Sequence, residues 1–389
     1  MTTALLPASG TSGRTPLIVG LLMMLVVLAP PAWAHKASDS FVYLTDNGQN
    51  LRIDVALRDL ALLVPLDADG DRQVTGAELR AARAELTRTV ESGVTTSASG
   101  EPCRLEGKTW GVSEHSDGFY AASQYRVRCP DGTAPDQLRY TLLFDVDPLH
   151  RALVSLGSED SERLTVIGPD TGSLDLAAPA PSRWQTFALF IGQGIWHLLM
   201  GLDHLLFLLV LAIPATLGRA GNVPEQGRVP GDPSSMGLKP RLRSLAGIVT
   251  AFTIAHSITL ALSALHLVTL PSAWVETVIA LSIAVTAVNV IWPILGRRTW
   301  LLAFGFGLVH GFGFASVLAD LTSGTGQLAV ALAGFNLGVE VGQLGLLAIG
   351  FPILYWLSQR PMYERRLVPA LLILVGITSL MWVGQRMPI

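Results

Sequence analysis

The sequence predicts a mainly α membrane protein, in which a small β-rich α+β domain outside the cytoplasm precedes a bundle of six transmembrane helices. Three observations support this fold class. The 389 residues are 50% hydrophobic and 15% charged, with a mean hydropathy of +0.45, which is too apolar for a soluble protein of this length. The first 34 residues have the pattern of a signal peptide. The second half consists of long apolar segments separated by polar connections.

The predicted signal peptide covers residues 1–34. Arg14 gives it a positive start, residues 17–28 form its apolar core, and Ala32-Trp33-Ala34 fits a cleavage site. The core is shorter than the about 20 residues of a membrane span. An uncleaved anchor is the alternative. Cleavage would make His35 the first residue, and its amine and imidazole would form a potential chelate for Cu(II) or Ni(II); a disordered terminus is the alternative.

Residues 35–183 have the composition of a soluble domain. Its strands are predicted from alternating polar and apolar residues, in SFVYLTD (40–46), LRIDVAL (51–57), QYRVRC (124–129) and LRYTLLFDV (138–146). Residues 75–86 predict a helix. Cys103 and Cys129, the only cysteines, follow the signal peptide, so we expect them to form a disulfide in an oxidising compartment. The proline-rich segment 176–183 predicts a linker to the membrane half.

The segment DADGDRQVTGAE (67–78) fits a calcium-binding loop. Its ligand positions 1, 3, 5, 7, 9 and 12 are occupied by Asp67, Asp69, Asp71, Gln73, Thr75 and Glu78. Arg72 replaces the glycine that normally makes the sharp turn, which predicts lower affinity. Because only one such loop is visible, we expect a bound Ca²⁺ to be structural. An acidic surface turn without an ion is the alternative.

The membrane half, residues 184–389, contains six apolar segments, at 187–213, 245–267, 273–295, 300–319, 328–357 and 367–384. Lys and Arg gather in the connections after the first, third and fifth segments, and are absent from residues 269–272 and 320–327. By the positive-inside rule the basic connections face the cytoplasm. The predicted location is the bacterial inner membrane, with the N-terminal domain and the C-terminus on the extracytoplasmic side.

Imidazole and carboxylate side chains interrupt these apolar segments. The residues concerned are His197, Asp203, His204, His256, Glu276, His310 and Glu340. An ionised group at the bilayer centre costs about 2.5 to 3.5 kcal/mol, so we expect these groups to share an interior site. Imidazole with carboxylate suits Ni(II), Co(II) or Zn(II), and this half contains no cysteine to supply a thiolate. For a single histidine, a hydrogen bond between packed helices is the alternative.

Spacing constrains how His197 and His204 could bind an ion. Seven residues apart, they share a helix face but lie about 10.5 Å apart along an ideal axis. Two donors at about 2.1 Å from one ion cannot span that distance. Either the helix breaks near Gly201, or the two histidines serve successive sites on a path. Asp203 points about 100° away from His204, so we expect it to orient a ligand on another helix.

Small and polar residues predict close helix packing around an interior path. Glycines surround His310 in GFGLVHGFGF (305–314), and the fifth segment has small residues at every fourth position, Gly334, Gly338 and Gly342. These spacings predict that the fourth and fifth segments pack closely against other helices. A polar stripe also follows the fifth segment, at Asn336, Glu340 and Gln343. In the second segment, His256 is flanked by Thr250, Thr253 and Ser257.

The run HLLMGLDH (197–204) resembles the H-x5-D-H motif of the HupE/UreJ family of bacterial membrane proteins, through His197, Gly201, Asp203 and His204. The run LVHGFGFASVL (308–318) is similar to that family's later glycine-rich histidine segment. The resemblance covers the membrane half and implies uptake of nickel or cobalt. Two departures, the long preceding domain and Leu198 where a proline is common, make the chain similar to a larger branch of the family.

The leading functional hypothesis is a permease for a divalent transition metal, with capture near His197 and Glu276 and transfer to His204, His256 and His310. An intramembrane zinc hydrolase, a haem-binding electron carrier and a non-transporting assembly or sensor protein are the alternatives. The expected partners are membrane lipid, the metal ion and an unidentified extracytoplasmic protein. Nucleic acid is not expected, because the net charge is −3 and no long basic run is present.

Overall fold

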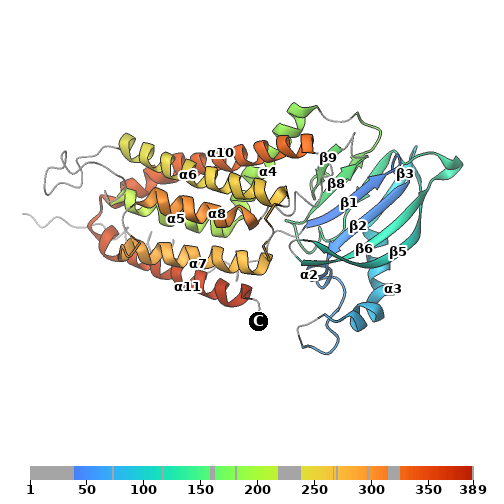
Figure 1. Cartoon of the computed structure of the whole chain (residues 1–389), viewed down its shortest axis with the longest axis horizontal. Helices are drawn as coiled ribbons and strands as arrows, with labels where there is room; N and C mark the ends of the chain where they lie inside the picture. The colour runs from blue at the N-terminus through green and yellow to red at the C-terminus, as the bar shows by residue number, and fades with distance from the viewer. Residues whose placement is uncertain are drawn as a thin grey trace, which may run out of the picture.

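The computed structural model describes residues 39–71, 74–115, 118–157, 163–179, 182–217, 238–265, 267–268, 270–295, 298–313 and 325–387. A β-rich domain occupies one end of the molecule, and the long helices extend away from it (Figure 1). The predicted signal peptide, His35 and Gln73 lie outside the described residues.

A six-stranded sheet forms the body of the β-rich domain, in the order β5-β6-β2-β1-β8-β9. Its strands are β1 (Asp39–Thr45), β2 (Asn50–Ala56), β5 (Arg104–His115), β6 (Gly118–Arg128), β8 (Arg151–Leu156) and β9 (Arg163–Ile167). Strands β1 and β8 pair in parallel, and the other neighbours are antiparallel. Because side chains alternate along a strand, this sheet has two faces to cover.

One face is covered by a helix and a smaller sheet. The four-stranded sheet has the order β10-β7-β3-β4, with strands β3 (Val94–Ala98), β4 (Glu101–Pro102), β7 (Gln137–Tyr140) and β10 (Ser173–Asp175). The short helix α2 (Leu57–Leu60) follows β2, and α3 (Gly76–Gly93) contributes Leu79, Leu86 and Val90 to the core between the sheets. The predicted disulfide between Cys103 and Cys129 is confirmed and packs against this core.

Two sequence-based boundaries in this domain were wrong. The strand predicted over 138–146 ends at Tyr140, and the chain then turns, with Leu143 at a φ of 69°. Leu142 and Leu143 are apolar because they are buried in the core, and not because they belong to a strand. The helix predicted over 75–86 continues to Gly93, since Leu86 and Val90 keep its buried face in contact with the core.

Among the described residues, four helical segments are long and apolar enough to cross a membrane: α6 (Leu238–Ala264), α7 (Ser272–Ile291), α10 (Thr325–Ser358), and α11 (Val368–Arg386) with the π-helical turn Tyr363–Leu367 before it. The count rises to five when the bent pair α4 (Arg183–Met200) and α5 (Leu202–Thr216) is taken as one span. Helix α8 (Thr299–His310) has only 12 residues, and 314–324 lie outside the described residues. The predicted count of six is therefore not confirmed.

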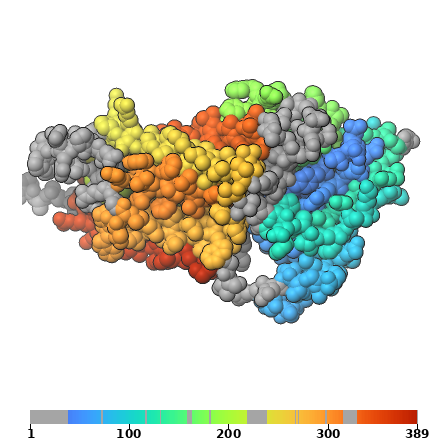
Figure 2. Space-filling view, viewed as in Figure 1, coloured from blue at the N-terminus to red at the C-terminus, as the bar shows by residue number. Residues whose placement is uncertain are grey.

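The second face of the large sheet packs directly on the helical bundle. Space-filling shows the domain seated at one end of the helices (Figure 2). The shared apolar cluster consists of Phe41, Ala56, Tyr120, Leu153 and Leu164 from the domain, and Phe190, Leu260, Ala264, Leu328, Ala331, Phe335 and Val339 from α4, α6 and α10. The C-terminal end of α11 lies at this same end of the bundle (Figure 1).

Candidate metal centre

The first apolar segment breaks at Gly201, which ends α4 and begins α5. The two helices meet at an angle of 74°. A Cβ at position 201 would lie 2.5 Å from Nδ1 of His204 and 3.1 Å from Oδ1 of Asp203, so no larger residue fits without displacing them. The helix therefore breaks near Gly201, and the seven-residue spacing no longer keeps the two histidines apart. The ring centroids of His197 and His204 lie 4.9 Å apart, and the two imidazoles are therefore neighbours.

A third imidazole joins this pair from the end of α8. The ring centroid of His310 lies 5.4 Å from that of His204. Nδ1 of His310 donates to the carbonyl oxygen of Phe306 at 2.8 Å, which leaves Nε2 with a lone pair for a ligand. His256 on α6 is connected to this group through Phe252, whose ring centroid lies 6.0 Å from His256 and 5.2 Å from His310.

Several ring nitrogens in this cluster are buried and lack a hydrogen-bond partner among the described residues. They are Nε2 of His204, both ring nitrogens of His256, and Nε2 of His310. Leaving a buried polar atom unpaired costs about 1 to 3 kcal/mol, and folded proteins rarely contain such atoms without a reason. These imidazoles therefore have nitrogen atoms available to bind a ligand inside the bundle.

Buried histidines of the β-rich domain are different. Nε2 of His150 lies 2.9 Å from the hydroxyl oxygen of Tyr140 and 3.1 Å from Oγ of Ser40, and Nε2 of His115 lies 2.7 Å from Asp54. Burial lowers the pKa of His150 to about 4, so this ring is neutral at pH 7. Hydrogen-bonded ring nitrogens of this kind are expected for buried histidines that only stabilise packing. The unpartnered nitrogens in the bundle consequently argue against packing as the sole role of those histidines.

Asp203 holds the ring of its own neighbour. Its Oδ1 accepts hydrogen bonds from the backbone N–H of His204 at 2.9 Å and from Nδ1 of that ring at 3.0 Å. The expectation that Asp203 orients a ligand on another helix was therefore wrong. Because Asp203 stands in the first turn of α5, its side chain folds back over the helix start. The contact fixes Nδ1 of His204 as the donor, so that Nε2 carries the lone pair.

The predicted polar stripe on α10 faces α6. Oγ1 of Thr250 donates to Oε1 of Glu340 at 2.6 Å, and Oγ1 of Thr253 donates to Oε1 of Gln343 at 3.0 Å. Oε2 of Glu340 and Oδ1 of Asn336 are buried without a partner among the described residues. Helix α6 also carries His256. The stripe therefore places the carboxylate of Glu340 against the same helix as this imidazole.

Glu276 on α7 is connected to the centre through Arg386. Its carboxylate accepts a hydrogen bond from Ser272 at 2.9 Å, and its backbone oxygen accepts one from Nη1 of Arg386 at 3.5 Å. The same Nη1 lies 3.7 Å from Oδ2 of Asp203. Sequence reasoning did not identify Arg386, because it stands just beyond the last apolar segment and looks like an ordinary flanking charge.

The two glycine-rich helices each pack closely against a neighbouring helix. A Cβ on Gly307 of α8 would lie 2.5 Å from the carbonyl oxygen of Phe252 on α6, and a Cβ on Gly334 of α10 would lie 2.5 Å from that of Phe187 on α4. The close packing predicted for these segments is thus found in two separate contacts, α8 with α6 and α10 with α4. Each brings a helix with polar residues against a helix with a histidine.

Phenyl rings close the cluster on the side away from the β-rich domain. The ring centroid of Phe207 lies 5.4 Å from those of Phe252 and His310, and 6.0 Å from that of Phe306. One helical turn further, Leu211 and Leu302 line a cavity of about 200 Å³ between α5, α7 and α8. The imidazoles are therefore separated from this cavity by a layer of aromatic side chains.

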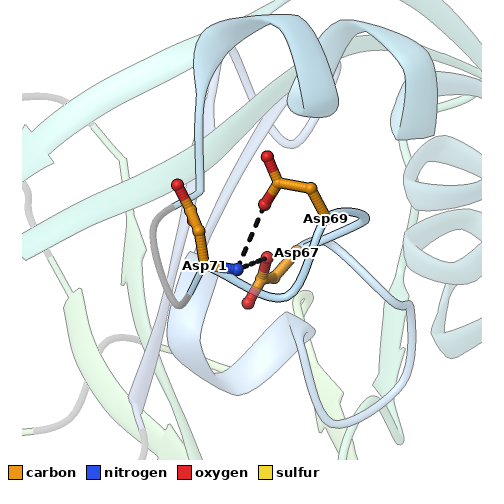
Figure 3. A group of neighbouring side chains, drawn as sticks. All are labelled: Asp67, Asp69 and Asp71. Atoms are coloured by element: carbon orange, nitrogen blue, oxygen red, sulfur yellow. Dashed lines mark hydrogen bonds between the residues drawn. The ribbon is translucent and has the colours of Figure 1, made fainter.

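The acidic loop places three carboxylates together. Oxygen atoms of Asp67, Asp69 and Asp71 all lie within 4.8 Å of one another (Figure 3). The backbone N–H of Asp71 donates to Asp67 and to Asp69, both at 3.1 Å. Glu78 instead accepts hydrogen bonds from the backbone N–H groups of Ala68 and Thr75, each at 2.8 Å, and these bonds lower its pKa. Thr75 and Glu78 form the capping box of α3.

Within the described residues, this loop is the one place where three ligand atoms of His, Cys, Asp or Glu gather within 4.8 Å. The imidazoles of the bundle are arranged differently, as neighbouring pairs: His197 with His204, and His204 with His310. Such an arrangement offers successive positions with few ligands, rather than one closed site with three or four.

A family model described as HupE / UreJ protein matches residues 174–386. The match covers more than half of the chain and spans α4 to α11, including all seven of the predicted metal-binding residues between His197 and Glu340. It does not include the acidic loop or the disulfide. No curated protein matches the chain.

Proposed function

The chain belongs to the HupE/UreJ family, and on that premise we propose that it is a membrane permease for a divalent transition metal, nickel or cobalt. The family is associated with nickel and cobalt transport. The observation that carries the proposal is the group of buried imidazoles, His204, His256 and His310, each of which has at least one ring nitrogen without a hydrogen-bond partner among the described residues. Imidazole is a suitable ligand for either metal.

The proposed path follows the order of the imidazole pairs. An ion captured near His197 and Glu276 would pass to His204 and then to His310 and His256, with Asp203 and Glu340 supplying negative charge. Neighbouring rings 4.9 Å and 5.4 Å apart support transfer between positions of incomplete coordination. Weak binding at several sites allows an ion both to enter and to leave. Broken helices at a central site, like α4 and α5, are also a feature of transporters.

The pairwise arrangement favours transport over an intramembrane zinc hydrolase. A zinc hydrolase needs three protein ligands that converge on one ion and leave one position open for water. The described imidazoles and carboxylates of the bundle do not bring three ligand atoms within 4.8 Å of one another.

We further propose the bacterial inner membrane as the location, with the β-rich domain and the C-terminus on the extracytoplasmic side. The position of the end of α11 next to the domain supports a common side for both (Figure 1). In the domain, we propose that Asp67, Asp69 and Asp71 bind a structural Ca²⁺, since hard oxygen ligands suit this ion. An extracytoplasmic protein partner for the domain remains part of the proposal.

Uptake of radioactive nickel and cobalt, with zinc as competitor, tests the proposed function. Cells would express wild type, His204→Ala or Ser282→Ala at matched membrane abundance. Ser282 is the control because it is also buried in the bundle, but its hydroxyl donates within α7 to the carbonyl oxygen of Ile279. We expect saturable uptake by wild type and Ser282→Ala, and a loss of about tenfold or more in His204→Ala.

Equal accumulation in wild type, His204→Ala and cells with an empty vector would contradict transport of these ions. Uptake that is lost equally in His204→Ala and Ser282→Ala would instead indicate that any change in the buried polar groups disrupts the bundle, and would not support a specific role for the imidazole.

A further inference from the structure

A buried arginine lies beside the proposed metal path, where a second cation is unexpected. The side chain of Arg386, at the end of α11, is 12% exposed. Its Nη1 lies 3.7 Å from Oδ2 of Asp203, the carboxylate that holds the ring of His204. A site that only had to attract a divalent cation would gain from the absence of this positive charge.

The contact between Arg386 and Asp203 is loose. A distance of 3.7 Å exceeds the length of an N–H···O hydrogen bond, and Nε of Arg386 has no partner among the described residues. The guanidinium group is held from other directions, by the ring of Trp382 at 5.2 Å and by the backbone oxygen of Glu276. Arg386 can therefore lose Asp203 as a partner while it keeps its remaining contacts.

The pairing of Arg386 with Asp203 affects how strongly a metal ion would be held at the centre. Asp203 accepts a hydrogen bond from the ring of His204, and Arg386 offsets the negative charge of this carboxylate. Without the guanidinium, a divalent ion bound beside Asp203 would meet an uncompensated carboxylate and would be held more strongly. Transport requires that the ion also leaves, and a site that binds too strongly becomes a trap.

We propose that Arg386 is a built-in counter-cation for Asp203. It pairs with the carboxylate when the path is empty, competes with the metal ion for that carboxylate, and so keeps binding weak enough for release. Because Arg386 can compete with an ion only if one binds here, this role depends on the proposed metal transport. Arg386 acts through Asp203 and is a positioning residue, not a ligand.

A simple structural role predicts the opposite effect. If Arg386 only tied α11 to α5 and α7, its loss would loosen Asp203 and the ring of His204, and metal binding would weaken. If Arg386 is a competing cation, removal of its charge strengthens binding. The sign of the change in affinity therefore separates the two roles.

Calorimetric titration of the purified full chain in lipid nanodiscs with Ni²⁺ and Co²⁺ measures that sign. The variants are Arg386→Gln, Arg386→Met, which keeps an apolar stem for Trp382, and Arg386→Lys, which keeps the charge. We expect the first two to lower Kd about tenfold, a coupling of about 1.4 kcal/mol, and the third to stay near wild type. In an Asp203→Asn background, we expect Arg386→Gln to leave Kd unchanged.

Uptake assays add the consequence for transport. We expect Arg386→Gln to reduce the maximal uptake rate even though it binds the ion more tightly, because release becomes slow. An unchanged or higher Kd in both charge-removing variants, with wild type binding normally, overturns the counter-cation role alone. If wild type binds neither ion, the proposed function fails as well. Thermal unfolding of each variant confirms that the compared proteins are folded.

Discussion

At the residue scale, two histidines of the bundle share one arrangement. Nδ1 of His204 donates to Asp203, and Nδ1 of His310 donates to the carbonyl oxygen of Phe306. In each ring the anchored Nδ1–H fixes the tautomer and leaves Nε2 buried without a partner. A hydrogen-bonded Nδ1 behind a ligating Nε2 is the usual support for a metal-bound imidazole. The acceptors of these Nδ1–H hydrogen bonds are therefore as important for metal binding as the rings themselves.

The acidic loop carries a prediction at this scale. Asp67, Asp69 and Asp71 gather three carboxylates, which repel one another unless a cation binds between them. We expect Ca²⁺ at about 100 times its Kd to stabilise the wild-type domain by about 2.7 kcal/mol, and Asp69→Asn to lose most of that gain. Thermal unfolding of the full chain with Ca²⁺ or with a chelator measures it. Asp170→Asn, at an exposed acid in a turn elsewhere in the domain, is the matched control.

Identical unfolding temperatures for wild type in Ca²⁺ and in chelator would contradict a bound calcium ion. An equal loss of the Ca²⁺ effect in Asp69→Asn and Asp170→Asn would show that the ion acts on the general acidity of the surface instead of on the loop.

The sequence was sufficient to predict most groups at the centre but not their pairing. Histidines and carboxylates in apolar segments are conspicuous, so His204, His256 and His310 could be identified directly. Arg386 could not, since an arginine at the end of an apolar segment is common and its partner Asp203 is far away along the chain. The prediction for Asp203 failed because it used only the angle between the two residues around the helix axis, whereas the Asp203 side chain folds back at the start of α5 onto His204.

At the element scale, breaks and close contacts between helices determine where the imidazoles meet. Helices α4 and α5 meet at Gly201 and bring His197 beside His204. Glycines on α10 allow the backbone of α4 to approach, and glycines on α8 allow that of α6. Small residues are therefore as important to this centre as the polar ones, because they set the distances between the helices that carry them.

Glycines on one helix provide a matched pair of substitutions. A Cβ on Gly338 of α10 would overlap the backbone of Ile191 on α4, whereas a Cβ on Gly345 of the same helix would meet nothing within 4 Å. We expect Gly338→Ala to destabilise the bundle by about 1 to 3 kcal/mol and Gly345→Ala to have little effect. Thermal unfolding of the purified chain in detergent, followed by size-exclusion chromatography, measures the difference. Equal stability of the two variants would contradict close packing of α4 on α10.

Hydropathy predicted the bounds of most long helices well, but it did not predict where a helix bends or which helices are in contact. The segments predicted over 245–267, 273–295, 328–357 and 367–384 correspond closely to α6, α7, α10 and α11. The break in the first segment was only one of two alternatives, because Leu202 to Leu211 continue the apolar composition across the bend. The sequence also could not indicate which helix each glycine-rich helix contacts.

At the scale of the whole molecule, the β-rich domain is packed onto the bundle through a shared core. Alternate residues of β1 and β8 serve different cores: Val42 and Val154 face the interior of the domain, whereas Phe41 and Leu153 face α4, α6 and α10. The domain is therefore docked on the bundle, in addition to being joined to it through the segment predicted as a linker. It covers the ends of helices that hold part of the metal centre.

Substitution at the shared core tests whether the two parts can be separated. Leu153 is 7% exposed and lies between domain and bundle, while Leu62 is 56% exposed on the domain surface. We expect Leu153→Asp to increase hydrogen exchange in α10 near residues 328–339, because a buried charge there forces the two surfaces apart, and Leu62→Asp to leave it unchanged. Hydrogen-exchange mass spectrometry of the full chain measures both. Equal exchange in the two variants would contradict a docked domain.

The shared core also has a consequence for biosynthesis. The sheet residues Phe41, Leu153 and Leu164 are made early, but their partners on α10, from Leu328 to Val339, are made only after most of the bundle. Translation at about 5 to 20 residues per second leaves part of that apolar face uncovered for about 10 to 35 s after the domain leaves the ribosome. During this interval the nascent domain exposes an apolar surface that promotes aggregation. A chaperone that covers this surface would have its greatest effect before α10 is synthesised.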